Sequence, residues 1–165
     1  RYRKSIFTRA IKLKDMGLTP HFTQHDIEAE IDRRVQRIED AIINRLAYLG
    51  EACVNNAIAM RGYTDRTGNL KSSTGFIVLA DGKVIVENFE TKAATADKGE
   101  NTGKDFARSL GAKYRQGYAL IVVAGMNYAA KVESTGRNVL STAEHYAEKE
   151  LPRMMRELKR NIATI

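Results

Sequence analysis

The sequence contains one cysteine, two prolines and no tryptophan in 165 residues. Because Cys53 is the only cysteine, an internal disulfide framework is excluded, and the chain fits a reducing compartment. No stretch approaches the roughly 20 apolar residues that a membrane helix requires, so we expect no membrane partner. The charged N-terminus is followed by no apolar segment, and we therefore expect no secretory signal peptide.

The sequence also lacks the residue patterns of catalytic, metal and cofactor sites, so we expect a protein that is not an enzyme and needs no cofactor. His21 and His25 are four residues apart, but a helix start predicted between them keeps them off one helical face, and two further metal ligands are missing. Gly99 and Gly103 are not followed by the helix start that cradles phosphate in a P-loop.

Positive charge is concentrated at one end of the chain. The net charge is +7, and residues 1–19 contribute +5 of it, because this segment contains six basic residues and one acidic residue. We predict a basic arm over residues 1–22. Such an arm binds phosphate through counterion release, but an acidic protein neighbour would satisfy it equally well. The possible contacts to DNA or to a partner are Arg1, Arg3, Lys4, Arg9, Lys12 and Lys14.

A long helix is predicted over residues 24–61, which would be roughly 55 Å long at 1.5 Å per residue. Thr23 with Asp26 is typical of a helix N-cap, and Gly62 is expected to end the helix. An eleven-residue period keeps the apolar residues on one face. These residues are Ile27, Ile31, Val35, Ile38, Ile42, Leu46, Leu49, Cys53, Ala57 and Met60. We expect the second, more apolar half to pack on a sheet with Cys53 buried, and one end to project toward another subunit.

A β-hairpin follows this helix. Residues 75–80 and 83–89 are two runs rich in β-branched and apolar residues, separated by Asp81 and Gly82. An Asp-Gly pair between such runs is a strong hairpin signal, because both turn positions take positive φ.

The second half of the chain predicts a loop, a strand and two helices. Residues 90–104 are polar and small, which indicates a loop or a long hairpin tip. A short helix is predicted over residues 105–116, and the apolar run 118–124 predicts a buried strand. A final helix is expected to begin at Ser141 and to run to about residue 161.

The start and middle of this final helix carry two signals. Ser141 with Glu144 indicates a capping box, and Pro152 predicts a kink or a division into two helices. Taken together, the elements predict one α+β domain over residues 23–165. Its small antiparallel sheet of three to four strands is packed with a long N-terminal helix and a C-terminal helix.

Two short motifs lie at the joints of this predicted fold, TGNLKSS from Thr67 and NYAAKVESTG from Asn127. In the first motif, Thr67 and Asn69 can bond the backbone while Gly68 takes positive φ, which forms a tight entry from helix to hairpin. In the second motif, Tyr128 and Val132 share a face at helical spacing.

Glu133 follows in the second motif, next to a turn at Thr135 and Gly136. A carboxylate at this place can accept backbone N–H groups or bond a neighbouring subunit. Taken singly, each motif could be a structural turn. Their order and setting in the chain carry more information: a long helix, TGNL, a hairpin, a buried strand, YAxxVExxG and a closing helix.

In this order and setting the two motifs resemble the tail-completion (minor tail, neck) proteins of long-tailed bacteriophages. The resemblance covers roughly residues 25–161. It implies a structural virion protein whose motif residues set the fold and the subunit contacts. These residues are Thr67, Gly68, Asn69, Leu70, Tyr128, Ala129, Val132, Glu133 and Gly136.

The resemblance further implies a ring homo-oligomer, by analogy a hexamer, at the head–tail junction or the head-proximal end of the tail. The implied partners are neck or head-closure proteins, tail-tube or tail-terminator proteins, and packaged DNA in the lumen. The implied location is the virion, and the host cytoplasm during assembly. The alternative is of a different class, a nucleic-acid-binding protein that acts through its basic arm.

Overall fold

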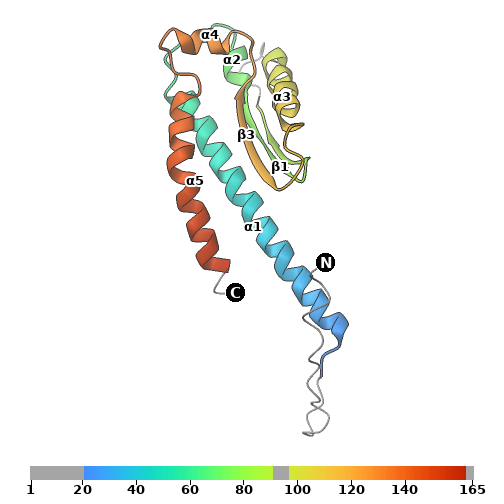
Figure 1. Ribbon diagram of the computed structural model, residues 1–165. Helices are drawn as coiled ribbons and strands as arrows, with labels where there is room; N and C mark the ends of the chain where they lie inside the picture. Colours follow the sequence, from blue (N-terminus) through green and yellow to red (C-terminus); the bar gives the residue numbers. More distant parts are fainter. Residues whose placement is uncertain (1–20, 91–96, 163–165) are drawn as a thin grey trace. The chain divides into compact units, whose positions relative to one another are not determined.

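The computed structural model describes residues 21–90 and 97–162 (Figure 1). The chain divides into two compact units, residues 1–37 and 38–165. The predicted boundary between a basic arm and a domain at residue 22 lies at the edge of the described residues and stays a prediction.

The long N-terminal helix is confirmed as α1, Gln24–Ala59. Its N-cap forms as expected, since the Asp26 carboxylate accepts the Thr23 N–H at 2.7 Å and Thr23 Oγ1 accepts the Asp26 N–H at 3.2 Å. Burial along its apolar face is uneven. Leu46, Leu49 and Cys53 are buried, whereas Ile27, Ile31 and Val35 in the part of α1 before residue 37 are exposed.

A three-stranded antiparallel sheet, order β2-β1-β3, lies in the second unit of the described chain. The predicted hairpin is confirmed as β1 (Thr74–Ala80) and β2 (Lys83–Asn88). Both turn residues take positive φ, 48° at Asp81 and 77° at Gly82, as a tight hairpin requires. The strand predicted at residues 118–124 is confirmed as β3, Tyr118–Ala124.

Helices cover both faces of this sheet, which confirms the predicted α+β class (Figure 1). On one face, Ile77 and Leu79 of β1 pack with Ala107 of α3, Asp97–Gly111. On the other face, Phe76 and Val78 of β1 pack with Leu46 of α1. Because side chains alternate along a strand, β1 is buried on both faces and forms the centre of the core.

The region predicted as a loop over residues 90–104 needs correction. Residues from Asp97 onward form the first half of α3, which ends at Gly111, so the short helix predicted over residues 105–116 is also misplaced. Gly99 and Gly103 weaken helix propensity, and their tertiary contacts override it. A Cβ atom on Gly103 would lie 2.5 Å from the Ser73 carbonyl oxygen, so glycine is what lets α3 lie against α2 and β1. Residues 91–96 lie outside the described residues.

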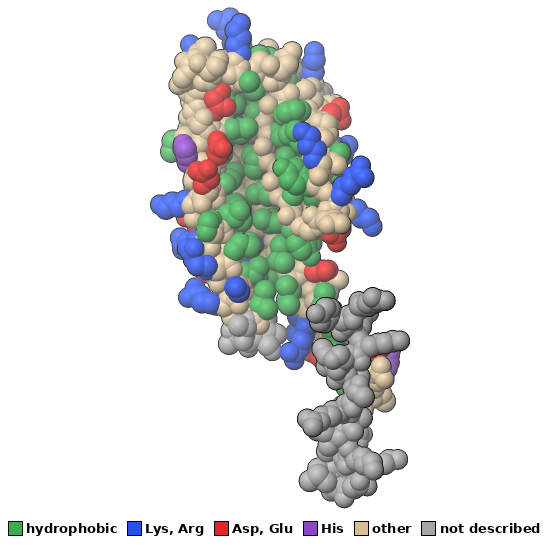
Figure 2. All heavy atoms as spheres, in the orientation of Figure 1, with side chains coloured by type: hydrophobic (Ala, Val, Ile, Leu, Met, Phe, Trp, Pro, Cys, Tyr) green, Lys and Arg blue, Asp and Glu red, His purple; other side chains and the backbone are tan. Residues whose placement is uncertain are grey.

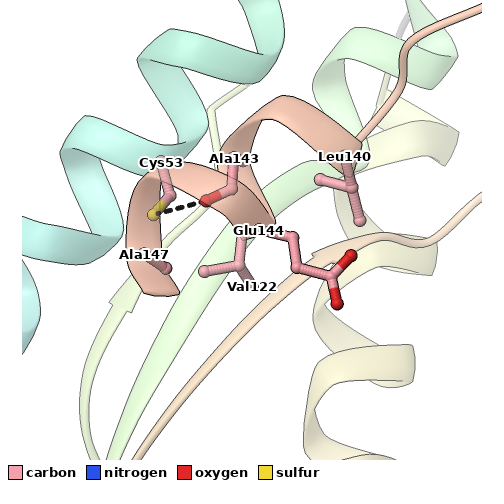
Figure 3. A pocket seen from close by; sticks show the side chains of 6 residues that line it. All are labelled: Cys53, Val122, Leu140, Ala143, Glu144 and Ala147. Carbon is pink, nitrogen blue, oxygen red and sulfur yellow. Dashed lines mark hydrogen bonds between the residues drawn. The ribbon is translucent and has the colours of Figure 1, made fainter. Parts of the chain in front are cut away.

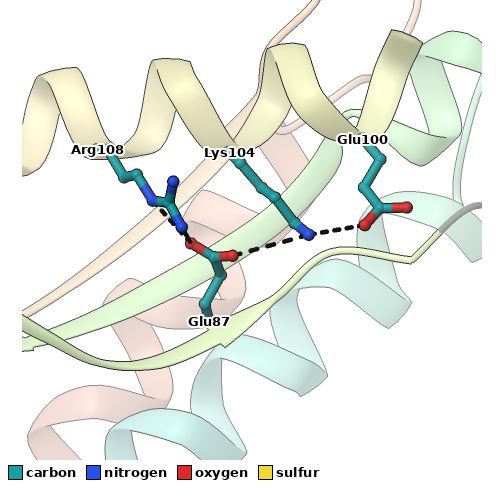
Figure 4. A network of polar contacts seen from close by, with 4 residues as sticks. All are labelled: Glu87, Glu100, Lys104 and Arg108. Carbon is teal, nitrogen blue, oxygen red and sulfur yellow. Dashed lines mark hydrogen bonds and ion pairs between the residues drawn. The ribbon is translucent and has the colours of Figure 1, made fainter. Parts of the chain in front are cut away.

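An ion-pair network joins α3 to β2 (Figure 4). The Glu87 carboxylate lies 2.9 Å from Arg108 Nη2 and 3.8 Å from Lys104 Nζ, and Lys104 Nζ is 2.7 Å from Glu100. These side chains are partly exposed, so each pair contributes at most about 1 kcal/mol. The network ties α3, which covers one face of the sheet, to the edge strand β2.

Two further predictions also need correction. β3 was expected to be buried, but most of its side chains are only half-buried, because β3 is an edge strand and part of one face lies open. The final helix, α5, runs over Ser141–Ile162 with Pro152 inside it, so of the two alternatives predicted at Pro152, a kink or a division into two helices, the division is wrong.

Replacement of Gly99 by alanine tests the close approach of α3. Alanine favours an isolated helix over glycine by about 1 kcal/mol. In this fold, however, the new Cβ would lie 2.8 Å from the Asn69 Cα and closer still to its carbonyl oxygen. We expect Gly99→Ala to lower the free energy of unfolding by about 1–3 kcal/mol, measured by denaturant titration.

The exposed Asn101 on the same helix supplies the matched control. Asn101→Ala should leave the free energy of unfolding unchanged or raise it slightly, because alanine has a higher helix propensity than asparagine. A stabilising Gly99→Ala substitution would contradict the packing described for α3.

Candidate functional site

The two sequence motifs, 60 residues apart, meet at one end of the sheet. Leu70 of the first motif is buried in a cluster with Ala129 of the second motif, and Val132 packs against the same cluster. A side-chain hydrogen bond joins Thr67 and Tyr128. The first motif supplies the short helix α2, Asn69–Ser72, and the second supplies α4, Ala129–Ser134. We call this region the motif junction; of the expected motif residues, Thr67, Leu70, Tyr128, Ala129 and Val132 make its contacts.

In the first motif, backbone N–H groups are held by side-chain oxygens. Gly68 takes the predicted positive φ, 74°. Asp65 accepts the N–H groups of Gly68 and Lys71 at 2.9 and 2.8 Å. Asn69 Oδ1 accepts the N–H of Gly99 at 3.1 Å, so the motif also fixes the first turn of α3. The expected hydrogen bond from the Asn69 side chain to the backbone is confirmed. The backbone group that it binds belongs to α3, however, and not to the first motif.

In the second motif, Glu133 caps the final helix. Its Oε1 accepts the N–H groups of Leu140 and Ser141 at 3.0 and 2.8 Å, and the Ser141 hydroxyl also donates to it. Partial burial by itself would raise the pKa of Glu133, but the hydrogen bonds outweigh it and hold the pKa below its ordinary value. A carboxylate here also faces the positive end of the helix dipole. Of the two roles expected for Glu133, the backbone contact is therefore confirmed.

The expected capping box of Ser141 and Glu144 is wrong. The Glu144 N–H bonds the Leu140 carbonyl instead, and the Ser141 hydroxyl is directed to Glu133. Asn138 supplies the second cap, since its Oδ1 accepts the Thr142 N–H at 3.0 Å while its Nδ2 donates to the Met60 carbonyl at 3.0 Å. Asn138 thereby ties the start of α5 to the residue after α1. Gly136, with φ 78°, makes the turn between Glu133 and these caps.

An open apolar groove runs below the motif junction (Figure 2). Three elements form it: the second half of α1, one face of β3, and α5. Six of its lining residues, two from each element in that order, are Ile42, Leu46, Leu120, Val122, Leu151 and Met155. Its volume is about 510 Å³. We call it the α1–β3–α5 groove; the open face of β3 forms one of its walls.

A smaller cavity of about 290 Å³ lies near the start of α5, with Val122 and Ala147 lining both it and the groove (Figure 3). Cys53 is buried beside it, and its Sγ lies 3.6 Å from the Ala143 carbonyl oxygen. Burial raises the pKa of the Cys53 thiol. The expectation of a small buried hydrophobe, rather than a reactive thiol, is consistent with this environment.

Apolar side chains are also exposed on the first part of α1. Ile27, Ile31 and Val35 are 40, 53 and 47% exposed. They follow one another at helical spacing, and we call them the N-terminal stripe. A shallow hollow is lined by Ile27 and Ile31 together with Phe22.

Within the residues that the structure describes, no group of three or more His, Cys, Asp or Glu side chains could hold a metal ion. His21 and His25 are exposed. No described helix is long and apolar enough to cross a membrane. The six basic residues predicted to contact DNA or a partner, Arg1 to Lys14, lie outside the described residues.

Sequence reasoning missed two capping residues and the groove. Asp65 precedes Gly68 by three residues, a spacing typical of side-chain caps. Asn138 precedes Thr142 by four residues, one more than such a cap usually spans, so its role has a weaker sequence signal. The groove has no sequence signal of its own, because its lining residues read as ordinary core positions of three separate elements.

Comparison of the chain with models of known protein families, with curated proteins and with solved structures finds no significant match.

The cap on α5 makes stability depend on the charge of Glu133. We expect Glu133→Ala to lower the free energy of unfolding by about 1–2 kcal/mol near neutral pH. Because the folded pKa is below the ordinary value of 4.5, the contribution of the carboxylate is present above that value and is lost as the pH falls through the folded pKa. The stability difference between the parent and Glu133→Gln should therefore shrink in acid.

Chemical denaturation between pH 7 and pH 3 measures this dependence, with Glu51→Gln on the exposed side of α1 as the control. The control should differ little from the parent across this range. A Glu133→Gln defect that persists unchanged at pH 3 would show that the charge of Glu133 does not stabilise α5.

Proposed function

We propose that this protein is a structural virion component of a long-tailed bacteriophage. Copies of the chain form a ring at the head–tail junction or at the head-proximal end of the tail, which completes the tail and allows the head to join. The protein acts through its surfaces rather than through catalysis. Its partners are further copies of itself and the neighbouring neck, head-closure, tail-tube or tail-terminator proteins.

The observation that carries this proposal is the amount of apolar surface that one chain leaves uncovered. The N-terminal stripe and the α1–β3–α5 groove are both open. Contiguous exposed apolar surface on a soluble protein commonly marks an interaction site. The resemblance of the two motifs to tail-completion proteins agrees with such a role, because the motif junction fixes the starts of α3 and α5 and so shapes one wall of the groove.

A second candidate is a nucleic-acid-binding protein that acts through the basic arm. The concentration of charge in residues 1–19 favours it. It requires strong DNA binding by the isolated chain, and the affinity should fall steeply with salt because phosphate contacts release counterions.

Light scattering with electron microscopy of the purified full chain tests the ring. We expect a concentration-dependent assembly of several subunits with a closed outline, and the same assembly after removal of residues 1–14. The ring proposal is contradicted by a chain that remains monomeric at every concentration, alone and when mixed with the head-closure and tail-tube proteins of its phage.

DNA titration of the same two preparations separates the second candidate. Salt-sensitive DNA binding by a monomer, lost when residues 1–14 are removed, would favour the nucleic-acid-binding protein over the ring. A ring whose assembly does not need residues 1–14 would favour the structural role.

A further inference from the structure

The N-terminal stripe and the α1–β3–α5 groove have comparable lengths. The stripe from Ile27 to Val35 occupies about 12 Å of helix axis, and the wall of the groove from Ala147 to Leu158 occupies about 16 Å of α5. A helix that presents apolar residues four apart fits a groove of this kind, as in helix-in-groove recognition. Both surfaces belong to the same chain, so every copy carries a ligand and a receptor.

We propose that the N-terminal stripe of one copy fills the α1–β3–α5 groove of the next copy. This inference rests on the proposed ring and specifies the contact that builds it. The contact joins two different surfaces, so it is heterologous, and repetition of a heterologous contact closes a ring when the rotation between copies permits. The sequence predicts that β3 is buried, but in the single chain it is half-buried. The docked stripe would cover the face of β3 that lines the groove.

Charge sets the direction in which the stripe docks. Residues 24–35 carry four acids, Asp26, Glu28, Glu30 and Asp32, against two basic residues, Arg33 and Arg34, which both pair with Glu30. This stretch therefore keeps an excess of two negative charges, and its first turns hold acids alone. The last part of α5 carries four basic residues, Arg153, Arg156, Lys159 and Arg160, against Glu157. Lys and Arg side chains also gather beside the lower part of the groove (Figure 2). The acidic start of α1 therefore meets the basic end of α5, and the docked helix runs antiparallel to α5.

The charges disfavour the basic arm as the occupant. Residues 1–19 carry +5, so they would be repelled by the basic end of α5. The stripe of the same chain is also disfavoured. Ile42 and Leu46 on the floor of the groove belong to α1, as the stripe does, so the stripe could fill its own groove only if α1 broke between Val35 and Ile42.

Mixing two defective variants tests the contact. Ile31→Glu places a charge in the stripe, and Leu151→Glu places one at the rim of the groove, where Leu151 is 38% exposed and tolerates a polar side chain. We expect each variant to be a folded monomer by circular dichroism and light scattering. A 1:1 mixture should give heterodimers of twice the monomer mass and nothing larger, because only one intact stripe and one intact groove remain per pair.

Asn55→Glu is the matched control, since it adds the same charge to an exposed position of α1 outside both surfaces and should assemble like the parent. Raising the salt concentration should weaken the parent assembly, since it screens the charges that orient the docked helix.

The outcomes distinguish the contact from the ring. If the parent forms rings and both variants also do, the stripe–groove contact is overturned while the proposed function stands. If the parent stops at a two-fold dimer that both variants disrupt, the contact stands while the ring is contradicted. Variants that remain monomeric but form no heterodimer on mixing would overturn the contact. The same result is expected if the basic arm of the same chain, rather than the stripe of another copy, occupies the groove.

Discussion

The fold depends on one constraint, the burial of β1 on both of its faces. The apolar side chains of Phe76 and Val78 are buried on one face of β1, and those of Ile77 and Leu79 are buried on the other. The α1 and α3 helices cover these two faces, and each is fixed by polar contacts rather than by apolar packing alone. Asn69 holds the first turn of α3, and Asn138 and Glu133 hold the start of α5 beside the end of α1. These contacts all lie at the motif junction.

The motif residues therefore fix the starts of helices and hold distant parts of the chain together. Each motif satisfies backbone N–H groups at a helix start, where four such groups have no partner within the helix. By fixing where α5 begins, the second motif also positions one wall of the α1–β3–α5 groove. The function that we propose lies on that open surface and on the N-terminal stripe.

Much of the fold could be predicted from the sequence because the signals are local. The period of α1, the Asp81–Gly82 turn and the apolar run of β3 each depend on neighbours in the chain, and all are confirmed. The failures have a tertiary cause. Gly99 and Gly103 indicate a loop until their contacts with Asn69 and Ser73 are known. For the candidate site, the sequence correctly identified Asn69 and Glu133 as backbone partners. It could not identify the groove, which exists only where three distant elements meet.

The central claim is that the uncovered groove receives α1 of a second copy. Oxidative cross-linking of a chain carrying Ile31→Cys and Leu151→Cys in a Cys53→Ala background tests it most directly, because a disulfide forms only when the two Cα atoms approach within about 7 Å. The account predicts a ladder of covalent multimers, with at most dimers from either single cysteine variant. A doubly substituted chain that assembles yet yields only monomers after oxidation would contradict it.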